Sequence, residues 1–544
     1  MTWPNLGESL RPMAMGRRGA VSSAHPLASG AGMRVLQAGG NAVDAAVATA
    51  AALNVAEPYM SGIGGTGYML IYTANDRRLR VLDYVGPTPR GATFDAFGSE
   101  SEKNYGPKAP LVPSACAGWL NAHEAFGSLP IADVFGPAIE YADSGVPLTV
   151  KNARYYGAAY DAGNLSELAK TVFMPTGSAP GSGQIIAQSM LAETFREVCA
   201  GGIESFYRGT LAKRIAKSVQ SAGGLLTEQD LEEYAPVWKE PLSVSYRGYT
   251  VACPPPRCSG WQYLQSLKML EATDIAASGH NTAETLHLLG ETFKLSVADR
   301  IAYTTSDCIN TEGMLSQEYV LARNALVDRD RAQRSEGDRY GGPRPDDSVQ
   351  PGDPALALKE CTTHFDVVDA EGNAVAVTQS LGDGFGSGFM AGDTGIMLNN
   401  FGYWFDFDQT SPNAIGPGKQ IEMCVAPAAV LQDDQLFMVI GTPGSFGILQ
   451  TTPQMISNVI DHQMSVQAAI EAPRIKAVVG TDLQIESRIG VDVRSALEAK
   501  GHTLVDVGEW SHLMGGGQGI MIDPESGAYA AGADPRRDGY ALAW

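Results

Sequence analysis

The sequence predicts an α/β protein with a large buried core, in which helices and β-hairpins follow one another along the chain. Two runs rich in β-branched residues flank an acidic Gly-Asn turn, the pattern of a hairpin over residues 360–380. Residues 41–56 are alanine-rich and nearly uncharged, which predicts a helix packed on all faces and capped by Asn41. In the second half, strand-like runs precede a helix over residues 450–460.

The remaining elements follow from the same rules of periodicity, capping and turn chemistry. Residues 62–67 have GxGxxG spacing, but a helix precedes them and a strand follows, the reverse of a dinucleotide site, so we interpret them as a close backbone approach. The other expected elements are helices at 28–38, 261–272 and 282–302, mainly helices between 118 and 270, a β segment at 242–251, strands at 68–72, 79–84, 395–399, 428–431 and 436–440, and a hairpin at 515–531.

Composition narrows the class of protein. The chain of 544 residues carries 39 Lys and Arg against 60 Asp and Glu, a net charge of −21, which disfavours nucleic acid as a partner. Its longest apolar run, 45–56, is too short to cross a membrane, and the amino terminus lacks the pattern of a secretory signal, so we expect a cytoplasmic protein. Seven cysteines without CxxC spacing argue against a disulfide framework or a zinc site.

Thr362 begins the central hairpin directly after a segment that is charged and broken by Gly and Pro. This segment, about 328–361, has too few large apolar side chains to bury itself, which predicts an exposed, flexible linker. If the Cys361–Thr362 peptide bond is cut, Thr362 gains an α-amine whose pKa of about 7.7–8.0 suits a general base for its own hydroxyl. The alternative is that Thr362 is an ordinary strand threonine, and this segment alone does not distinguish the two.

A second glycine cluster, residues 441–447, lies after a predicted strand and before a predicted helix. Backbone N–H groups at such a turn can converge on an oxyanion, although an ordinary glycine-rich turn has the same pattern. It is not a nucleophile elbow around Ser445, because Pro443 stands where that motif needs glycine.

Taken together, these motifs resemble the γ-glutamyltransferase family of N-terminal-nucleophile hydrolases. The resemblance covers nearly the whole chain and rests on several motifs in the same order: 23–29, 39–46, 61–65, 362–364, 372–378, 398–400, 442–445 and 533–539.

The resemblance implies a four-layer αββα sandwich and autocatalytic cleavage before Thr362. The products are a large chain, 1–361, and a small chain, 362–544, which stay together as one composite domain. Thr362 is then the nucleophile, with its freed amine as the base, and Ser380 the hydroxyl residue that supports it. Gly444 and Ser445 match the pair whose backbone N–H groups form the oxyanion hole.

The substrate-binding positions depart from the family pattern. Members that act on glutathione hold the glutamyl carboxylate with an arginine and two serines, and grip its amine with polar and acidic residues. Without these partners a zwitterion loses several kcal/mol for each uncompensated charge, which favours a smaller or more apolar acyl group. The residues at these positions are Val85, Phe401, Trp404, Met423 and Cys424, and Gly382 replaces an asparagine that the family has near the nucleophile.

The resemblance and the altered pocket together predict a self-processing amidohydrolase that acts on a small amide, of the oxamate or N-acyl type. The loop from Trp404 to Gly418 is short, and an open pocket favours hydrolysis over transfer. The alternatives are a glutathione hydrolase or γ-glutamyltransferase with unfamiliar binding residues, and an inactive binding module of the same fold. No cofactor and no metal is expected; the partners are a small molecule, the protein's own two chains and possible further copies.

Overall fold

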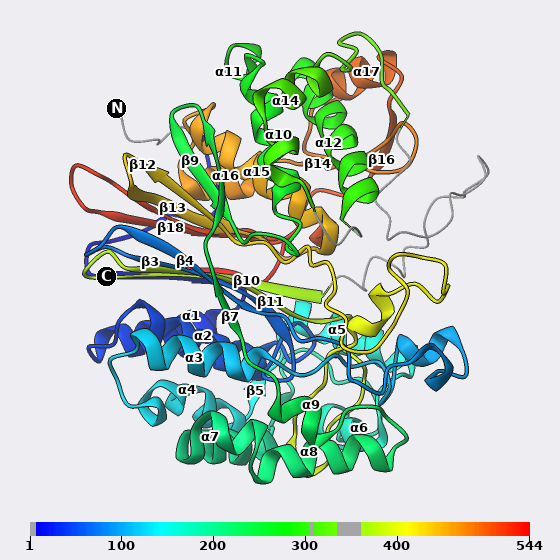
Figure 1. The fold of residues 1–544 in the computed structure, drawn as a ribbon. Coiled ribbons are helices and arrows are strands. Elements are labelled where there is room, and N and C mark those ends of the chain that lie inside the picture. The colour runs from blue at the N-terminus through cyan, green and yellow to red at the C-terminus, as the bar shows by residue number, and fades with distance from the viewer. Residues whose placement is uncertain (1–6, 305–308, 335–360) are drawn as a thin grey trace.

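Two stacked β-sheets lie between two layers of helices in the computed structural model, which describes residues 7–304, 309–334 and 361–544 (Figure 1). This arrangement confirms the expected αββα sandwich. Among the described residues each main sheet has seven strands, all antiparallel to their neighbours.

The first sheet contains, in spatial order, β1 (Ala14–Gly16), β18 (Tyr529–Ala533), β17 (Gln518–Ile522), β13 (Gln435–Gly441), β12 (Ala428–Gln432), β9 (Tyr249–Cys253) and β8 (Leu242–Tyr246). The second contains β19 (Tyr540–Ala543), β2 (Gly19–Ser23), β10 (Cys361–Asp369), β11 (Ala374–Gly382), β3 (Thr66–Thr73), β4 (Arg78–Tyr84) and β7 (Val237–Lys239). Both sheets therefore combine strands that precede residue 361 with strands that begin at or after it.

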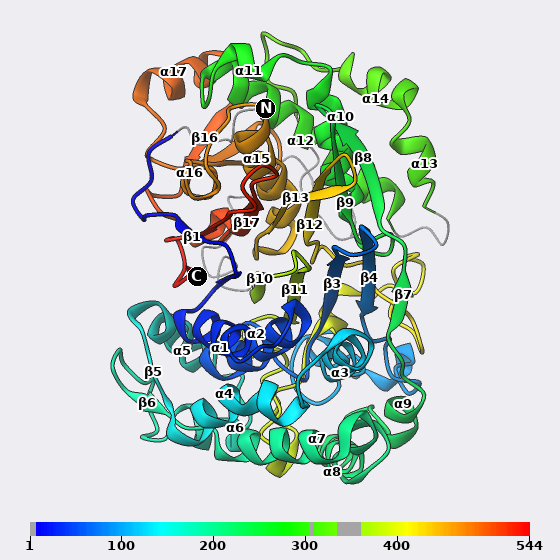
Figure 2. The same ribbon diagram turned by 90° about the vertical axis from the view of Figure 1, so that its left-hand side faces the viewer.

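One helix layer covers the second sheet, and another covers the first (Figures 1 and 2). The layer on the second sheet contains α1 (Pro26–Gln37), α2 (Ala42–Ala56), α3 (Ala115–Phe126), α4 (Ile131–Ser144), α7 (Ser189–Tyr207) and α8 (Thr210–Ser221). The layer on the first sheet contains α10 (Trp261–Glu271), α12 (Ala283–Tyr303), α15 (Ile448–Ile460) and α16 (Val466–Glu471).

Shorter elements complete the periphery. They are α5 (Val150–Ala162), α6 (Glu167–Phe173), α9 (Glu228–Glu232), α11 (Ile275–Ser278), α13 (Thr311–Met314), α14 (Gln317–Asn324), α17 (Val491–Ala499), β5 (Val146–Pro147) with β6 (Ile185–Ile186), and a small sheet of β14 (Ile475–Ala477), β15 (Asp482–Ile485) and β16 (Thr503–Asp506).

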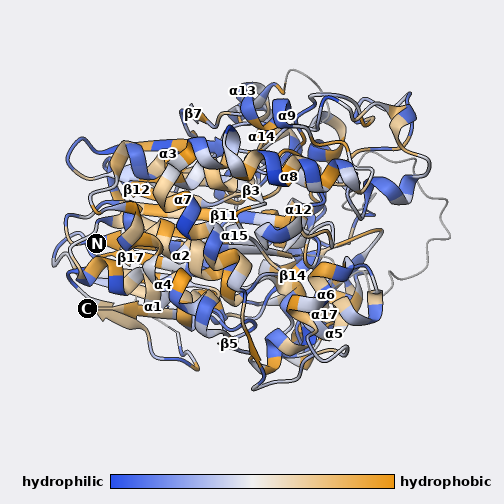
Figure 3. Ribbon diagram, turned by 90° about the horizontal axis from the view of Figure 1, so that it is seen from below, coloured by the Kyte–Doolittle hydropathy of each residue, from blue (hydrophilic) through white to orange (hydrophobic). Residues whose placement is uncertain are grey.

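Local sequence explains the buried centre of the sandwich. Every residue of α2 is buried, as the alanine-rich pattern predicts, and Asn41 caps its start in a reciprocal capping box with Asp44. Apolar residues concentrate on the inner helices and strands (Figure 3). Gly64 permits a close approach, because a Cβ there would overlap the carbonyl of Met397. Among the described residues, no helix is long and apolar enough to cross a membrane.

The predicted hairpins at 360–380 and 515–531 are confirmed as β10–β11 and β17–β18. The predicted strand at 395–399 is wrong. Gly395 adopts φ +70, outside the extended region, and the apolar residues that follow it form a buried loop with a single bridge at Met397. The expected flexible linker lies mostly outside the described residues, so its conformation stays a prediction.

Candidate active site

Thr362 lies at the second position of β10, next to a β-bulge. The register with β11 shifts between Cys361 and Thr363, so that Thr362 faces both Ser380 and Leu381. A bulge of this kind turns side chains away from the regular ladder. Here it places the Ser380 side chain beside that of Thr362, which is 4% exposed.

The Ser380 hydroxyl uses all of its hydrogen-bonding capacity at this point. It accepts from the Thr362 hydroxyl at 3.3 Å and from the Gly382 N–H at 2.8 Å, and it donates to the Cys361 carbonyl at 2.5 Å. A serine hydroxyl has one donor and two acceptor sites, so none is left over. Ser380 therefore contacts both the expected nucleophile and the carbonyl of the peptide bond expected to be cut.

Arg537 reaches the same strand from the C-terminal tail. Its Nη1 donates to the Thr362 carbonyl at 3.2 Å and lies 3.3 Å from the sulfur of Met60. Glu57 interacts electrostatically with Arg537. Burial raises the pKa of Glu57 to about 8, although the positive charge of Arg537 counteracts this shift. A buried cation thus holds the backbone of Thr362 while the hydroxyl faces Ser380.

The turn after β13 presents the N–H groups of Gly444 and Ser445. Gly444 has φ +133 and Ser445 begins the 3-10 helix η6 (Ser445–Gly447), whose first N–H groups have no partner within the helix. Within the described part of the chain, neither N–H donates to a protein acceptor. The ring of His364 packs on Gly441, where a Cβ would lie 2.5 Å from it, and so joins the end of β13 to β10. This arrangement suits stabilisation of an oxyanion.

Aromatic side chains border this turn. Phe401 and Trp404 belong to the 3-10 helix η5 (Phe401–Trp404); their ring centroids are 5.4 Å apart at an interplanar angle of 79°. Trp404 also stacks on Phe446, at 5.4 Å and 27°, and Phe446 directly follows Ser445. The structure therefore brings two of the expected pocket residues to the expected oxyanion turn.

Met423 and Cys424 are buried, and the residue before them, Glu422, connects them to the turn after β13. The carboxylate of Glu422 pairs with Arg300 at 3.1 Å, and the Arg300 guanidinium lies 3.7 Å from the ring centroid of Phe446. The uncharged residues Met423 and Cys424 thus directly follow the ion pair of Glu422 with Arg300.

Val85 is placed further away, because β11 and β3 lie between β10 and β4, the strand that it follows. It lines a cavity of about 290 Å³ to which Gly418 and Gln420 also contribute. Val85 therefore faces the segment that leads to Met423 and does not stand beside Thr362.

Gly382 and Asn400 share one small space. Gly382 adopts φ +104, and a Cβ on it would overlap the side-chain oxygen of Asn400. That oxygen accepts from the Asp383 N–H at 2.8 Å, and the Asn400 N–H donates to the Leu381 carbonyl at 2.9 Å. The side chain of Asn400, which directly precedes η5, thus occupies the space that a side chain at position 382 would need.

Sequence reasoning missed Arg537 and Asn400 as site residues, although both belong to motifs that carried the resemblance. It also missed Asp383, whose carboxylate accepts from the Tyr105 hydroxyl. Two signals pointed to them: an arginine in a turn that the fold buries, and an asparagine directly before the altered position 401.

The αββα sandwich and a threonine at the start of a central strand define the class of N-terminal-nucleophile hydrolases. The model of the gamma-glutamyltranspeptidase family matches residues 28–544. The glutathione hydrolase proenzyme of Bacillus subtilis (strain 168) is 34% identical over 99% of this chain and 94% of its own length. The acylase ACY 1 proenzyme of Pseudomonas sp. (strain V22) is 35% identical over 97% of this chain and 94% of its own.

The solved structure of cephalosporin acylase from Bacillus halodurans superimposes with a TM-score of 0.88 at 33% identity, covering 100% of this chain and 98% of that one. The chain belongs to the gamma-glutamyltranspeptidase family and is a hydrolase of the N-terminal-nucleophile type. Its relatives support a general amidohydrolase activity.

Proposed function

We propose that this protein is a self-processing N-terminal-threonine amidohydrolase that cleaves a small acyl amide other than a γ-glutamyl compound. The observation that carries the proposal is the Ser380 hydroxyl, which contacts both the Thr362 hydroxyl and the Cys361 carbonyl. Relatives described as proenzymes support the processing step.

In the proposed processing step, Thr362 Oγ1 attacks the carbonyl carbon of Cys361. The Cys361–Thr362 amide bond breaks, an ester to Thr362 Oγ1 forms, and the proton of the hydroxyl passes to the released amine. The hydrogen bond from Ser380 to the Cys361 oxygen supports this step, because that oxygen gains negative charge during the attack. Water then hydrolyses the ester and leaves Thr362 with a free amine.

In the proposed turnover, the free amine of Thr362 takes the proton from its own hydroxyl as Oγ1 attacks the substrate amide. The N–H groups of Gly444 and Ser445 stabilise the oxyanion, and the amine portion of the substrate leaves with the transferred proton. Water attacks the acyl-enzyme ester and releases the acid. Arg537 keeps the main chain of Thr362 fixed through its bond to the carbonyl.

The residues around the oxyanion turn support the proposed substrate class. Phe401, Trp404 and Phe446 form an aromatic wall, and Met423 and Cys424 supply no charge. Arg300 is already paired with Glu422. These surroundings favour an apolar or compact acyl group over a γ-glutamyl zwitterion. The acylases among its relatives support the same choice.

A glutathione hydrolase remains the second candidate, because the chain is 34% identical to an enzyme of that description over nearly its whole length. That activity needs a partner for the glutamyl carboxylate, and Arg300 supplies one if it exchanges Glu422 for the substrate.

The test combines electrophoresis with an amide screen. The purified chain is compared with its Thr362→Ala variant on denaturing gels, and both are assayed for amine release from oxamate and from glutaryl, aryl-acyl and γ-glutamyl p-nitroanilides. We expect two bands and activity for the parent chain, one band and no activity for the variant, and at least a ten-fold lower kcat/KM for the γ-glutamyl amide. Brisk γ-glutamyl turnover overturns the substrate class, and a parent chain that stays uncut overturns processing.

A further inference from the structure

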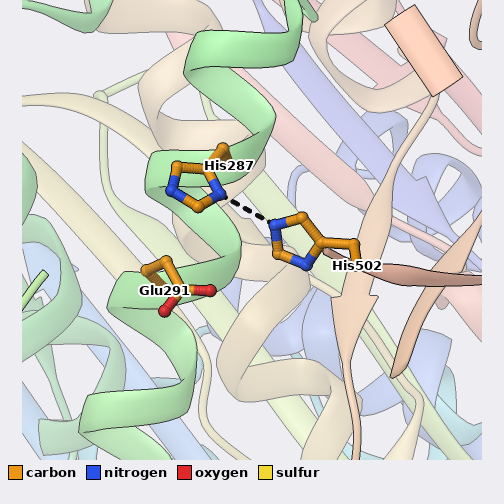
Figure 4. A group of neighbouring side chains, drawn as sticks. All are labelled: His287, Glu291 and His502. Atoms are coloured by element: carbon orange, nitrogen blue, oxygen red, sulfur yellow. Dashed lines mark hydrogen bonds between the residues drawn. The ribbon is translucent and has the colours of Figure 1, made fainter. Parts of the chain in front are cut away.

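Three side chains that can bind a metal meet in the helix layer above the first sheet, away from the second sheet that holds Thr362 (Figures 1 and 4). His287 and Glu291 lie on α12, and His502 lies just before β16. One ligand atom from each falls within 4.8 Å of the others, and all three residues are buried. Among the residues that the structure describes, no other group of His, Cys, Asp and Glu meets this condition.

The chain brings these residues together from distant positions. His287 and Glu291 are four residues apart on one helix and therefore share a face. His502 is 215 residues beyond His287, so sequence spacing showed no site, and none was expected. The N–H of His502 donates to the Leu497 carbonyl at 3.2 Å, which fixes its backbone at the end of α17.

The hydrogen bonds of the two rings determine where their protons lie. His287 Nε2 is 2.7 Å from the carbonyl of Asp328, and a carbonyl only accepts, so Nε2 carries the proton and Nδ1 holds a lone pair. His287 Nδ1 is 2.8 Å from His502 Nε2, which must therefore be the donor. His502 Nδ1 is left as a second lone pair, buried in a residue that is 4% exposed and without a partner among the described residues.

Glu291 completes the group and has its own support. Its Oε1 accepts from Lys294 at 2.7 Å and its Oε2 from the Gln333 N–H at 3.2 Å. Each carboxylate oxygen has two lone pairs, so both can still bind a metal. Lys294 opposes a cation, but its ammonium also donates to the Gln333 carbonyl at 2.7 Å, which leaves it held when Glu291 shares its charge with a metal.

We propose that His287, Glu291 and His502 bind a divalent transition-metal ion, with Zn²⁺ as the best match. Two imidazoles and one carboxylate suit zinc, whereas Mg²⁺ and Ca²⁺ prefer oxygen ligands alone. The bond from His287 Nε2 to a backbone carbonyl is the outer contact that metal-bound histidines usually make. Zinc–nitrogen bonds of about 2.0–2.1 Å in tetrahedral geometry require the two rings to separate slightly from their hydrogen-bonded contact. They also require the proton of His502 to move from Nε2 to the unpartnered Nδ1, so that the facing nitrogens of both rings hold lone pairs.

The site has a structural consequence that rests on the proposed function. His287 and Glu291 precede the Cys361–Thr362 bond, and His502 follows it. Once that bond is cut, a metal at this site joins the large chain to the small one. Metal binding itself does not require the cut, so the uncut Thr362→Ala precursor should bind the ion as well as the parent does.

The test measures zinc binding by untagged full-length protein. The parent chain and the Thr362→Ala precursor are stripped with a chelator, titrated with ZnCl₂ in a calorimeter and analysed for bound metal after dialysis. We expect one tightly bound Zn²⁺ per 544-residue chain in both, and a rise in Tm on adding the ion. His502→Gln and Glu291→Gln should each weaken binding by more than roughly 10–100-fold, the cost of losing an outer contact alone.

His280→Gln is the matched control, because His280 and His462 form another ring pair, 5.2 Å apart, that belongs to no such group. It should bind zinc as the parent does. The proposal is overturned if the parent binds no zinc after dialysis, or if His502→Gln and Glu291→Gln bind it as tightly as His280→Gln. Co²⁺ spectra give a second readout. A ligand-field spectrum that stays unchanged in both His502→Gln and Glu291→Gln also overturns the proposal.

Discussion

The side-chain oxygen of Asn400 lies where a side chain on Gly382 would have to stand. Gly382 also adopts φ +104, a conformation that residues with a Cβ avoid. Its N–H donates to the Ser380 hydroxyl at 2.8 Å, so a shift of this residue is passed to the hydroxyl that contacts Thr362.

Gly382→Ala should therefore lower both stability and activity. Backbone strain alone costs about 1–3 kcal/mol, and displacement of Asn400 adds to it. The measurements are urea unfolding of the Thr362→Ala background and amide hydrolysis by the processed enzyme. Gly223→Ala is the matched control, because Gly223 has φ +80 with nothing within 4 Å of an added Cβ. If Gly382→Ala and Gly223→Ala lower the free energy of unfolding equally, the overlap with Asn400 does not contribute. If the double variant Gly382→Ala/Asn400→Ala recovers stability, the overlap causes the loss.

Ser380→Ala should slow processing and turnover together. The change removes the donor to the Cys361 carbonyl and the acceptor for the Thr362 and Gly382 groups, and each unsatisfied buried group costs about 1–3 kcal/mol. We expect a persistent precursor band and a kcat lower by roughly 10²-fold. Ser380→Thr keeps the hydroxyl and should restore both rates. A Thr variant as slow as the Ala variant would mean that the residue acts through packing alone.

Trp404→Phe should change which acyl group is preferred while keeping most of the stability. The smaller ring still contacts Phe401 and Phe446 but leaves room beside the expected oxyanion turn. The ratio of kcat/KM for bulky over small acyl amides should rise by roughly ten-fold, within the range that one pocket contact provides. Trp238→Phe, at a residue 38% exposed, is the control and should leave this ratio unchanged. Equal ratios in the two variants would exclude Trp404 from the acyl pocket.

Local patterns were enough to predict the central hairpin and the buried helix beside it. The β-branched runs of the central hairpin and the Asn41 cap of α2 are properties of neighbouring residues, and both appear where expected. The apolar run at 395–399 misled because burial in a loop and burial in a strand select the same side chains. The structure separates the two cases, because Gly395 adopts φ +70 and the run pairs only through a single bridge at Met397.

Long-range contacts account for what the sequence could not show. Arg537 meets Thr362 across 175 residues, and His502 meets His287 across 215. No spacing rule covers such distances, because the packing of whole layers decides them. The contact between Gly382 and Asn400 is also a tertiary property. The sequence shows only that position 382 has no side chain, whereas the structure places the side-chain amide of Asn400 in that space.

Glu57 gives the site a dependence on pH. Burial raises its pKa from 4.5 to about 8, although Arg537 counteracts the shift. Between these two values the unfolded chain releases a proton that the folded chain keeps, so the contribution of Glu57 to stability is complete below pH 4.5 and is lost as pH rises towards 8. The slope is at most about 1.4 kcal/mol per pH unit.

Glu57→Gln should remove this slope, because glutamine stays neutral at every pH. The measurement is the free energy of unfolding in urea from pH 5 to pH 8, made in the Thr362→Ala background so that a single chain unfolds. The parent background should lose stability relative to Glu57→Gln as pH rises through this window, while Glu124→Gln, at an exposed helix position, should follow the parent. Parallel curves for the parent and Glu57→Gln would show that Glu57 is already ionised in the folded protein. In that case the Glu57 carboxylate offsets the buried charge of Arg537, the residue that donates to the Thr362 carbonyl.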